Sequence, residues 1–159
     1  LDWSTAKELP WDILILFGGG LALSSRFTAS GLSEWIGTQV SALETLPLIL
    51  IVAVVAALVL GLTELTSNTA TAATFLPLIG GVAMGLGVDP LLLVIPVAIV
   101  ATCAFMLPVA TPPNAIAFSS GHVQIADMVK AGLWLNLIAL VLTTLVTFTL
   151  AVWVFGIVY

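Results

Sequence analysis

The charged residues of this chain are placed so that four long stretches contain none. These stretches are residues 45–63, 65–88, 90–126 and 131–159. Each one is about as long as, or longer than, the roughly 18–20 apolar residues that a helix needs to cross a lipid bilayer. A water-facing surface cannot be built over such a succession of uncharged segments. The sequence therefore predicts an all-α membrane protein whose surroundings are lipid or other protein.

The composition excludes several classes of function. Only 7% of the residues are charged, against about 25% in a soluble domain. Lys and Arg together number 3, too few for a nucleic-acid ligand. We find no nucleophile–base pair, metal-ligand cluster or cofactor motif, so the sequence predicts neither an enzyme nor a cofactor. The chain starts without Met on a polar segment, and we expect it to be part of a longer protein.

Two elements are expected before the first polar interruption. Residues 11–28 are apolar, with tryptophans at the start and three glycines, Gly18 to Gly20, that predict close helix packing or a bend. Residues 30–43 repeat apolar side chains every three or four positions, with polar side chains on the other face. This pattern predicts an amphipathic helix lying in the membrane interface.

The first polar interruption follows the apolar run 45–66. Ser67, Asn68 and Thr69 interrupt the apolar sequence, and an alanine-rich stretch that favours helix follows them. Serine and asparagine are good N-cap residues, so a new helix is expected to begin here. Two interpretations remain open: a binding site at the helix N-terminus, or a patch of hydrogen bonds between helices.

The second interruption is set by proline. Pro108, Pro112 and Pro113 remove backbone donors and disfavour helix at Thr111. Residues 109–113 are therefore expected to open and to free backbone carbonyls inside an apolar run. A simple kinked span is the alternative.

The signs of the charges restrict the ligand. No Lys or Arg lies between Arg26 and Lys130. An anion bound at the interruptions would therefore be held by helix N-termini and hydroxyls, with a metal cation as its natural partner. Glu64 lies next to the first interruption and is expected either at an aqueous cavity or paired with an absent segment. His122 is expected at the surface.

Two motifs together resemble the divalent anion/sodium symporter family, the sodium-coupled carriers of di- and tricarboxylates and sulfate. They are TSNTATAATFLPL at 66–78 and LPVATPPNAIAFSSGH at 107–122. The resemblance implies a scaffold helix at 11–28, an interfacial arm at 30–43, a re-entrant hairpin at 45–87 with its tip at 67–69, a broken helix at 90–121 and a terminal span at 131–158. Length alone also allows two full spans in place of the hairpin.

The same resemblance implies the site residues. The substrate residues would be Ser67, Asn68, Thr69, Thr111 and Pro112. One sodium ion would be held by Thr63, Thr66, Asn68 and Ala110, mostly through backbone carbonyls.

The resemblance also implies a function. It predicts sodium-coupled, elevator-type transport of a small dianion (dicarboxylate, citrate or sulfate) by a multi-pass protein of the cell inner membrane. The family is typically a homodimer of two inverted repeats, and this chain would carry only the second. A carrier of related architecture for arsenite or for sodium and protons is the alternative, as is a structural membrane subunit that transports nothing.

Overall fold

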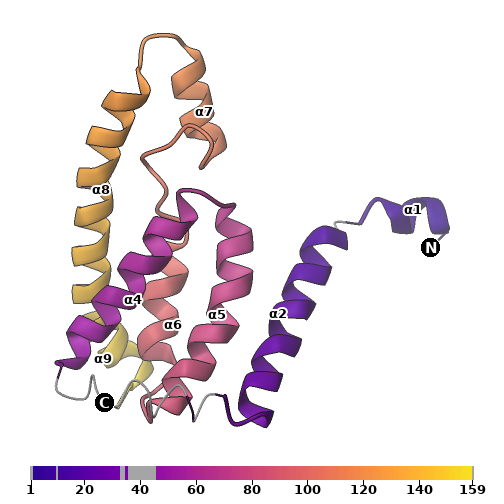
Figure 1. Cartoon of the computed structure of the whole chain (residues 1–159), viewed down its shortest axis with the longest axis vertical. Helices are drawn as coiled ribbons and strands as arrows, with labels where there is room; N and C mark the ends of the chain where they lie inside the picture. The colour runs from indigo at the N-terminus through magenta and orange to yellow at the C-terminus, as the bar shows by residue number, and fades with distance from the viewer. Residues whose placement is uncertain (1, 10, 33–34, 36–45, 159) are drawn as a thin grey trace.

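The computed structural model describes residues 2–9, 11–32, 35 and 46–158. These residues form helices and connecting segments without a strand, in agreement with the predicted all-α class (Figure 1). The elements are α1 (Trp3–Lys7), α2 (Trp11–Ala29), α4 (Leu48–Thr63), α5 (Asn68–Gly85), α6 (Leu91–Val100), α7 (Pro112–Ser119), α8 (Ile125–Val146), the π-helical segment η2 (Thr147–Ala151) and α9 (Val152–Phe155). The interfacial arm expected at 30–43 lies almost entirely outside the described residues.

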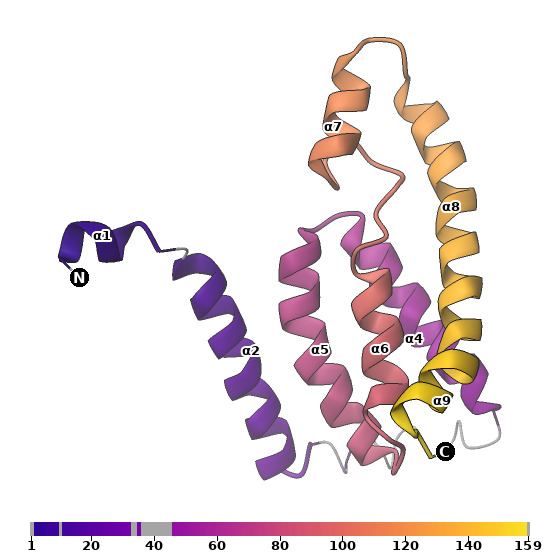
Figure 2. The same ribbon diagram turned by 180° about the vertical axis from the view of Figure 1, so that it is seen from behind.

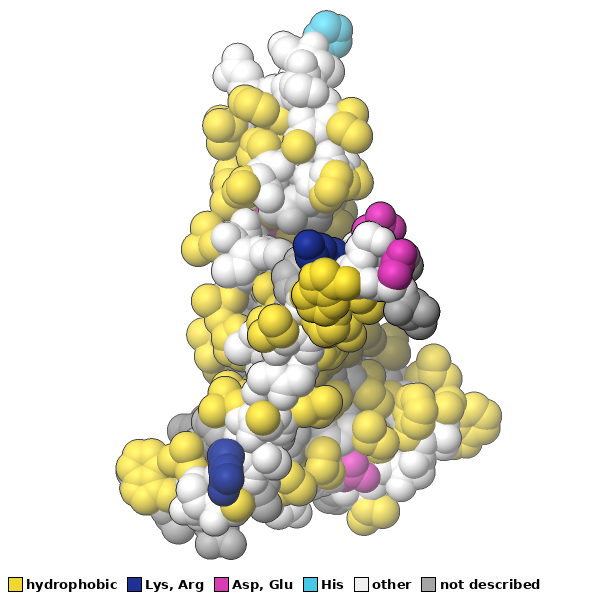
Figure 3. All heavy atoms as spheres, turned by 90° about the vertical axis from the view of Figure 1, so that its right-hand side faces the viewer, with side chains coloured by type: hydrophobic (Ala, Val, Ile, Leu, Met, Phe, Trp, Pro, Cys, Tyr) yellow, Lys and Arg dark blue, Asp and Glu magenta, His cyan; other side chains and the backbone are white. Residues whose placement is uncertain are grey.

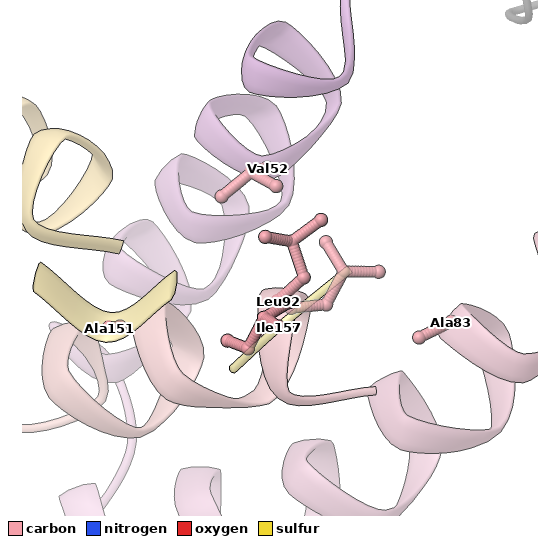
Figure 4. Close-up of a cluster of buried hydrophobic side chains, with 6 residues drawn as sticks. Val52, Ala83, Leu92, Ala151 and Ile157 are labelled. Atoms are coloured by element: carbon pink, nitrogen blue, oxygen red, sulfur yellow. The ribbon is translucent and has the colours of Figure 1, made fainter. Parts of the chain in front are cut away.

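Helices α4, α5 and α6 form the centre of the molecule. Helix α4 runs into a short turn and α5 returns beside it, with α6 packed against both (Figures 1 and 2). Small and branched apolar side chains let these helices approach closely, because they occupy little space between the backbones. One buried cluster joins α4 to α6 through Ala56, Val59, Val97 and Val100. A second, at the opposite end, brings Val52 together with Ala83, Leu92, Ala151 and Ile157 (Figure 4).

The chain between α6 and α7 is not helical. Helix α6 ends at Val100 and α7 begins at Pro112, so residues 101–111 form an irregular connecting segment with turns at 101–102 and 108–110. The opening expected at 109–113 therefore starts earlier and ends sooner than predicted: Pro112 and Pro113 already belong to α7, because proline at the first helical positions loses no intrahelical hydrogen bond. It leaves the bundle between α5 and α8 and leads up to α7 (Figure 2). We call residues 101–111 the unwound segment.

Helix α8 is the longest element. Together with η2 and α9 it covers Ile125–Phe155, 31 residues that include an 18-residue stretch with a mean hydropathy of 2.4, enough to cross a bilayer by length and composition. It begins at Ile125, earlier than the expected 131. One face is buried through Met128, Gly132 and Asn136, which recur at the four-residue spacing of a helix face.

The outside of the molecule is largely apolar. Hydrophobic side chains cover much of the face in Figure 3, and charged groups are few on it. His122 lies exposed at one end. Helix α2 packs against α5, and a Cβ built on Gly20 would lie 2.5 Å from the Ala73 carbonyl oxygen. Helix α1 extends away from the bundle (Figure 1).

Candidate functional site

The two polar interruptions line one pocket. A pocket of about 670 Å³ is bounded by residues 65–69 on one side and by residues 108–112 and Ala115 on the other. All five residues expected to contact substrate lie in its wall, and so do Thr66, Asn68 and Ala110 of the expected sodium set. The structure therefore brings together two segments that lie far apart in sequence.

The hairpin side of the pocket is shaped by a helix N-cap. Ser67 has extended backbone angles, and its hydroxyl accepts a hydrogen bond from the Ala70 amide at 3.5 Å. This is the geometry of a serine N-cap. Asn68 and Thr69 occupy the first positions of α5, where backbone amides have no acceptor within the helix. Thr66 packs its hydroxyl 2.6 Å from that of Thr71 and adds a second polar group there.

Thr63 lies just below the pocket and is fully buried. Its hydroxyl oxygen is 2.6 Å from the Ala101 carbonyl oxygen and 2.8 Å from Asn68 Oδ1. The Asn68 amide also donates to the Thr102 carbonyl at 3.4 Å. The hairpin tip is thus linked to the beginning of the unwound segment. Several oxygen atoms gather at this point, which is the donor chemistry that hard cations prefer.

The opposite side of the pocket is shaped by α7. Thr111 has an extended backbone and caps this helix: its hydroxyl accepts a hydrogen bond from the Asn114 backbone amide at 3.3 Å. Proline occupies the first helical position. The Asn114 side chain donates to the carbonyls of Ala104 and Leu107, each at 3.0 Å. These two bonds satisfy carbonyls that the unwound segment has freed from helical partners.

Glu64 does not lie at an aqueous cavity, which was the first of its two expected positions, because it is only 1% exposed. Pairing with an absent segment stays a prediction, and among the described residues Glu64 has no basic partner. Its carboxylate accepts hydrogen bonds from the backbone amides of Phe105 at 2.8 Å, Met106 at 3.0 and 3.1 Å and Leu107 at 3.3 Å. The Asn136 side chain donates a further bond at 2.7 Å. Successive backbone amides form an anion-binding concavity, which explains how a carboxylate is held without a cation.

Three residues of this arrangement were not found from the sequence: Asn114, Gly132 and Asn136. Asn114 had a signal, since it directly follows the Pro–Pro pair. Asn136 had a weaker one, as a single amide within the apolar run of α8. Gly132 gave none, because a glycine in an apolar helix is common. Its role appears only in space, where a Cβ would lie 2.5 Å from the Phe105 carbonyl oxygen and 2.6 Å from Met106 Cα.

A second cavity lies between α2 and α5. It has about 400 Å³ and is lined by apolar and glycine residues, among them Phe17, Leu21, Leu76 and Met84. Such a lining offers no hydrogen bonds to a polar solute. The pocket at the two interruptions is therefore the better candidate for ligand binding.

Apolar helices that carry two polar interruptions into one pocket define a membrane protein built around a solute site. The sequence matches the family described as the sodium:sulfate symporter transmembrane region over residues 1–157, and the chain belongs to that family. This match confirms the resemblance predicted from the two motifs.

Curated relatives agree with the family. The chain is 48% identical over 157 residues to the sodium-dependent dicarboxylate transporter SdcS of Staphylococcus saprophyticus, and 51% identical to the SdcS of Staphylococcus aureus. Each alignment covers 99% of this chain and 30% of the relative. The chain therefore spans about a third of the length of these transporters. Both relatives are named as transporters rather than as enzymes.

Proposed function

We propose that the protein containing this chain transports C4-dicarboxylates such as succinate, malate and fumarate across the membrane, coupled to sodium. The observation that carries the proposal is the pocket at the two interruptions, where two helix N-termini meet and no basic side chain lies in the described wall. The names of the curated relatives support the same solute and the same coupling ion.

The substrate is held by backbone amides and hydroxyls. Helix N-termini carry partial positive charge and unpaired N–H groups, so they bind carboxylates without a basic residue. Ser67, Asn68 and Thr69 contribute amides and hydroxyls from α5. At the start of α7 Pro112 and Pro113 have no N–H, so that end contributes through the Thr111 hydroxyl and amide and through the helix dipole, with Pro112 shaping the wall. These residues stand on opposite sides of the pocket, which suits a small solute with an anionic group at each end.

Sodium supplies the missing positive charge. We assign one ion to Thr63, Thr66, Asn68 and Ala110. The buried Thr63 hydroxyl, the Asn68 side-chain oxygen and freed carbonyls of the unwound segment support this assignment. No cofactor takes part. Because the ion lies beside the anion, each raises the affinity of the other, and this mutual effect couples their transport.

The whole transporter contains more than this chain. We propose a multi-pass protein of the cell inner membrane with two inverted repeats, of which residues 1–159 are most of the second, assembled as a homodimer. The hairpin 45–87 and the segment 90–121 belong to a mobile transport domain that crosses the membrane in an elevator-type movement. Residues 11–28 and the arm 30–43 belong to the scaffold, and 131–158 form the terminal span.

Flux measurements on the full-length protein test the proposal. Reconstituted in proteoliposomes, it should accumulate labelled succinate under an inward sodium gradient and not under a potassium gradient. Asn68→Ala should abolish this uptake, because both the substrate site and the sodium site lose a side chain. Thr74→Ala is the control, since Thr74 lies exposed on α5 beyond the pocket wall.

Competition by sulfate and citrate identifies the solute class. Inhibition by malate and fumarate alone supports a C4-dicarboxylate carrier, and inhibition by sulfate moves the assignment to inorganic dianions. Sodium-independent uptake, or full uptake by Asn68→Ala, contradicts the proposal. The alternative carriers and the structural subunit have no observation in their favour.

A further inference from the structure

The terminal helix α8 contributes no residue to the wall of the pocket at the two interruptions, yet it lies against the backbone of Phe105 and Met106, just before the wall residues 108–112. Its buried face carries Gly132 and Asn136, one helical turn apart. Gly132 lies directly under the backbone of Phe105 and Met106, and Asn136 donates to Glu64. Both contacts converge on residues 105–107, the middle of the unwound segment.

The three amides of residues 105–107 have a single acceptor, the Glu64 carboxylate. Asn136 is bonded to the same carboxylate, at Oε1, and is 3% exposed. The ionised carboxylate accepts from every neighbour, so Asn136 must turn its NH₂ group toward it. This orientation leaves Asn136 Oδ1 buried and without a partner among the described residues. Stability alone does not explain a buried amide that leaves its own oxygen unpaired.

The position of residues 105–107 fixes both halves of the pocket. On one side the unwound segment begins with the carbonyls of Ala101 and Thr102, which contact Thr63 and Asn68. On the other side it continues directly into residues 108–112 of the pocket wall. A shift of the three amides therefore displaces the proposed sodium ligands and the proposed substrate ligands together.

We propose that Gly132 and Asn136 of α8 are positioning residues for the binding pocket, acting through Glu64 and the amides of residues 105–107. This inference rests on the proposed function only where transport is measured. Glycine at 132 allows the unwound segment to lie against α8, and Asn136 holds the carboxylate in the orientation that receives all three amides.

Two variants of the full-length protein test the proposal at different atoms. Asn136→Ala removes the donor to Glu64 together with the unpaired oxygen, so the variant should still fold. Gly132→Ala places a methyl group against the backbone of Phe105 and Met106. Two matched controls are Thr144→Ala, a buried α8 hydroxyl bonded to its own helix, and Gly61→Ala, where a Cβ meets nothing within 4 Å.

Transport kinetics give the first readout. In both test variants the KM values for sodium and for succinate should rise together by about tenfold, the equivalent of one lost hydrogen bond, while the maximal rate per folded transporter changes little. The controls should keep the wild-type KM. A purely structural role would lower the amount of folded protein and leave the KM values unchanged, and that result would overturn the proposal.

Amide hydrogen exchange gives a second readout that needs no transport. The peptide containing residues 105–107 should exchange faster in both test variants than in the wild type and the controls. Unchanged exchange in Asn136→Ala overturns the proposal even if Gly132→Ala fails to fold. If the wild type shows no sodium-dependent uptake, the proposed function fails, and the exchange measurement alone still decides the role of α8.

Discussion

At the residue scale, the main feature is a buried carboxylate that has no cationic partner within the described part of the chain. Glu64 is stabilised by backbone amides and one side-chain amide, and both of its oxygens are used. Hydrogen bonds to a charged group contribute about 1.5–3 kcal/mol each, whereas an unpaired buried charge costs several kcal/mol. The buried carboxylate is therefore tolerated because both of its oxygens accept hydrogen bonds, and the neighbouring amides are satisfied by the same contacts.

Replacing Glu64 tests this balance. In Glu64→Gln the new NH₂ group must face either the backbone amides or the donor of Asn136, so at least one buried donor loses its acceptor. We expect the free energy of unfolding to fall by about 2–4 kcal/mol. The melting temperature of the purified full-length protein in detergent measures this loss.

Asp127→Asn is the control for that measurement. Asp127 is exposed in the first turn of α8, where a carboxylate contributes at most about 1 kcal/mol through the helix dipole. Similar melting temperatures for the two variants would contradict the assignment of the Glu64 contacts.

Thr111 combines a structural and a proposed binding role that substitution can separate. Thr111→Ala removes the hydroxyl that caps α7, at a cost of about 1 kcal/mol. It also removes a group from the pocket wall, so the KM for succinate should rise. Thr111→Ser keeps the hydroxyl and should restore both the melting temperature and the KM. Loss of affinity in the serine variant as well would show that the methyl group, and not the cap, is required.

At the element scale, the sequence predicts the starts of helices better than their ends. Ser67 caps α5 as expected, because an N-cap signal is local, whereas the Pro–Pro pair, expected inside the opening at 109–113, begins α7. The end of α6 at Val100 was not predicted. Residues 101–107 contain no proline or glycine, and their amides bond to Glu64, a partner distant in sequence. Helix α8 starts before the expected position because its first turn tolerates Asp127.

The same distinction holds for the candidate site. The residues expected in the pocket lie within two short motifs, so the sequence alone indicated which of them would be close together. Asn136 lies 72 positions from Glu64 and bonds to it across the bundle, which no local pattern reveals. Long-range contacts of this kind follow from packing and not from propensity or spacing.

The contact between α2 and α5 depends on one of three consecutive glycines. Gly20→Ala should separate the two helices, because a Cβ there meets the Ala73 carbonyl oxygen at 2.5 Å. Gly18→Ala and Gly19→Ala meet nothing within 4 Å and should be neutral or slightly stabilising, since alanine favours helix over glycine by about 1 kcal/mol. Thermal unfolding of the three full-length variants distinguishes them. Equal effects at all three positions would indicate a bend and not a packing contact.

At the scale of the whole molecule, the outer surface is as apolar as a core. Large hydrophobic side chains are exposed along α4, α8 and α9, among them Leu58, Leu133, Trp134 and Trp153. Exposed apolar area of this extent is covered by lipid or by further protein. The chain covers 30% of the length of its curated relatives.

The 159-residue chain by itself should therefore not transport. One side of the solute path is missing if the first repeat provides it, so the isolated chain, reconstituted in proteoliposomes, should show no sodium-dependent succinate uptake. The full-length protein, prepared in the same lipid, is the positive control. Uptake by the isolated chain would overturn the proposal that two repeats are needed.

The lining of the pocket at the two interruptions has one further consequence. Its described walls consist of threonine, serine, asparagine, proline and aliphatic residues, and none of these side chains gains or loses a proton near neutrality. Acidifying the medium leaves such walls unchanged and alters only the solute, whose carboxylates become protonated. The rate of uptake should accordingly fall with pH in proportion to the doubly ionised fraction of the solute. Its pH dependence then arises from the transported solute and not from the pocket.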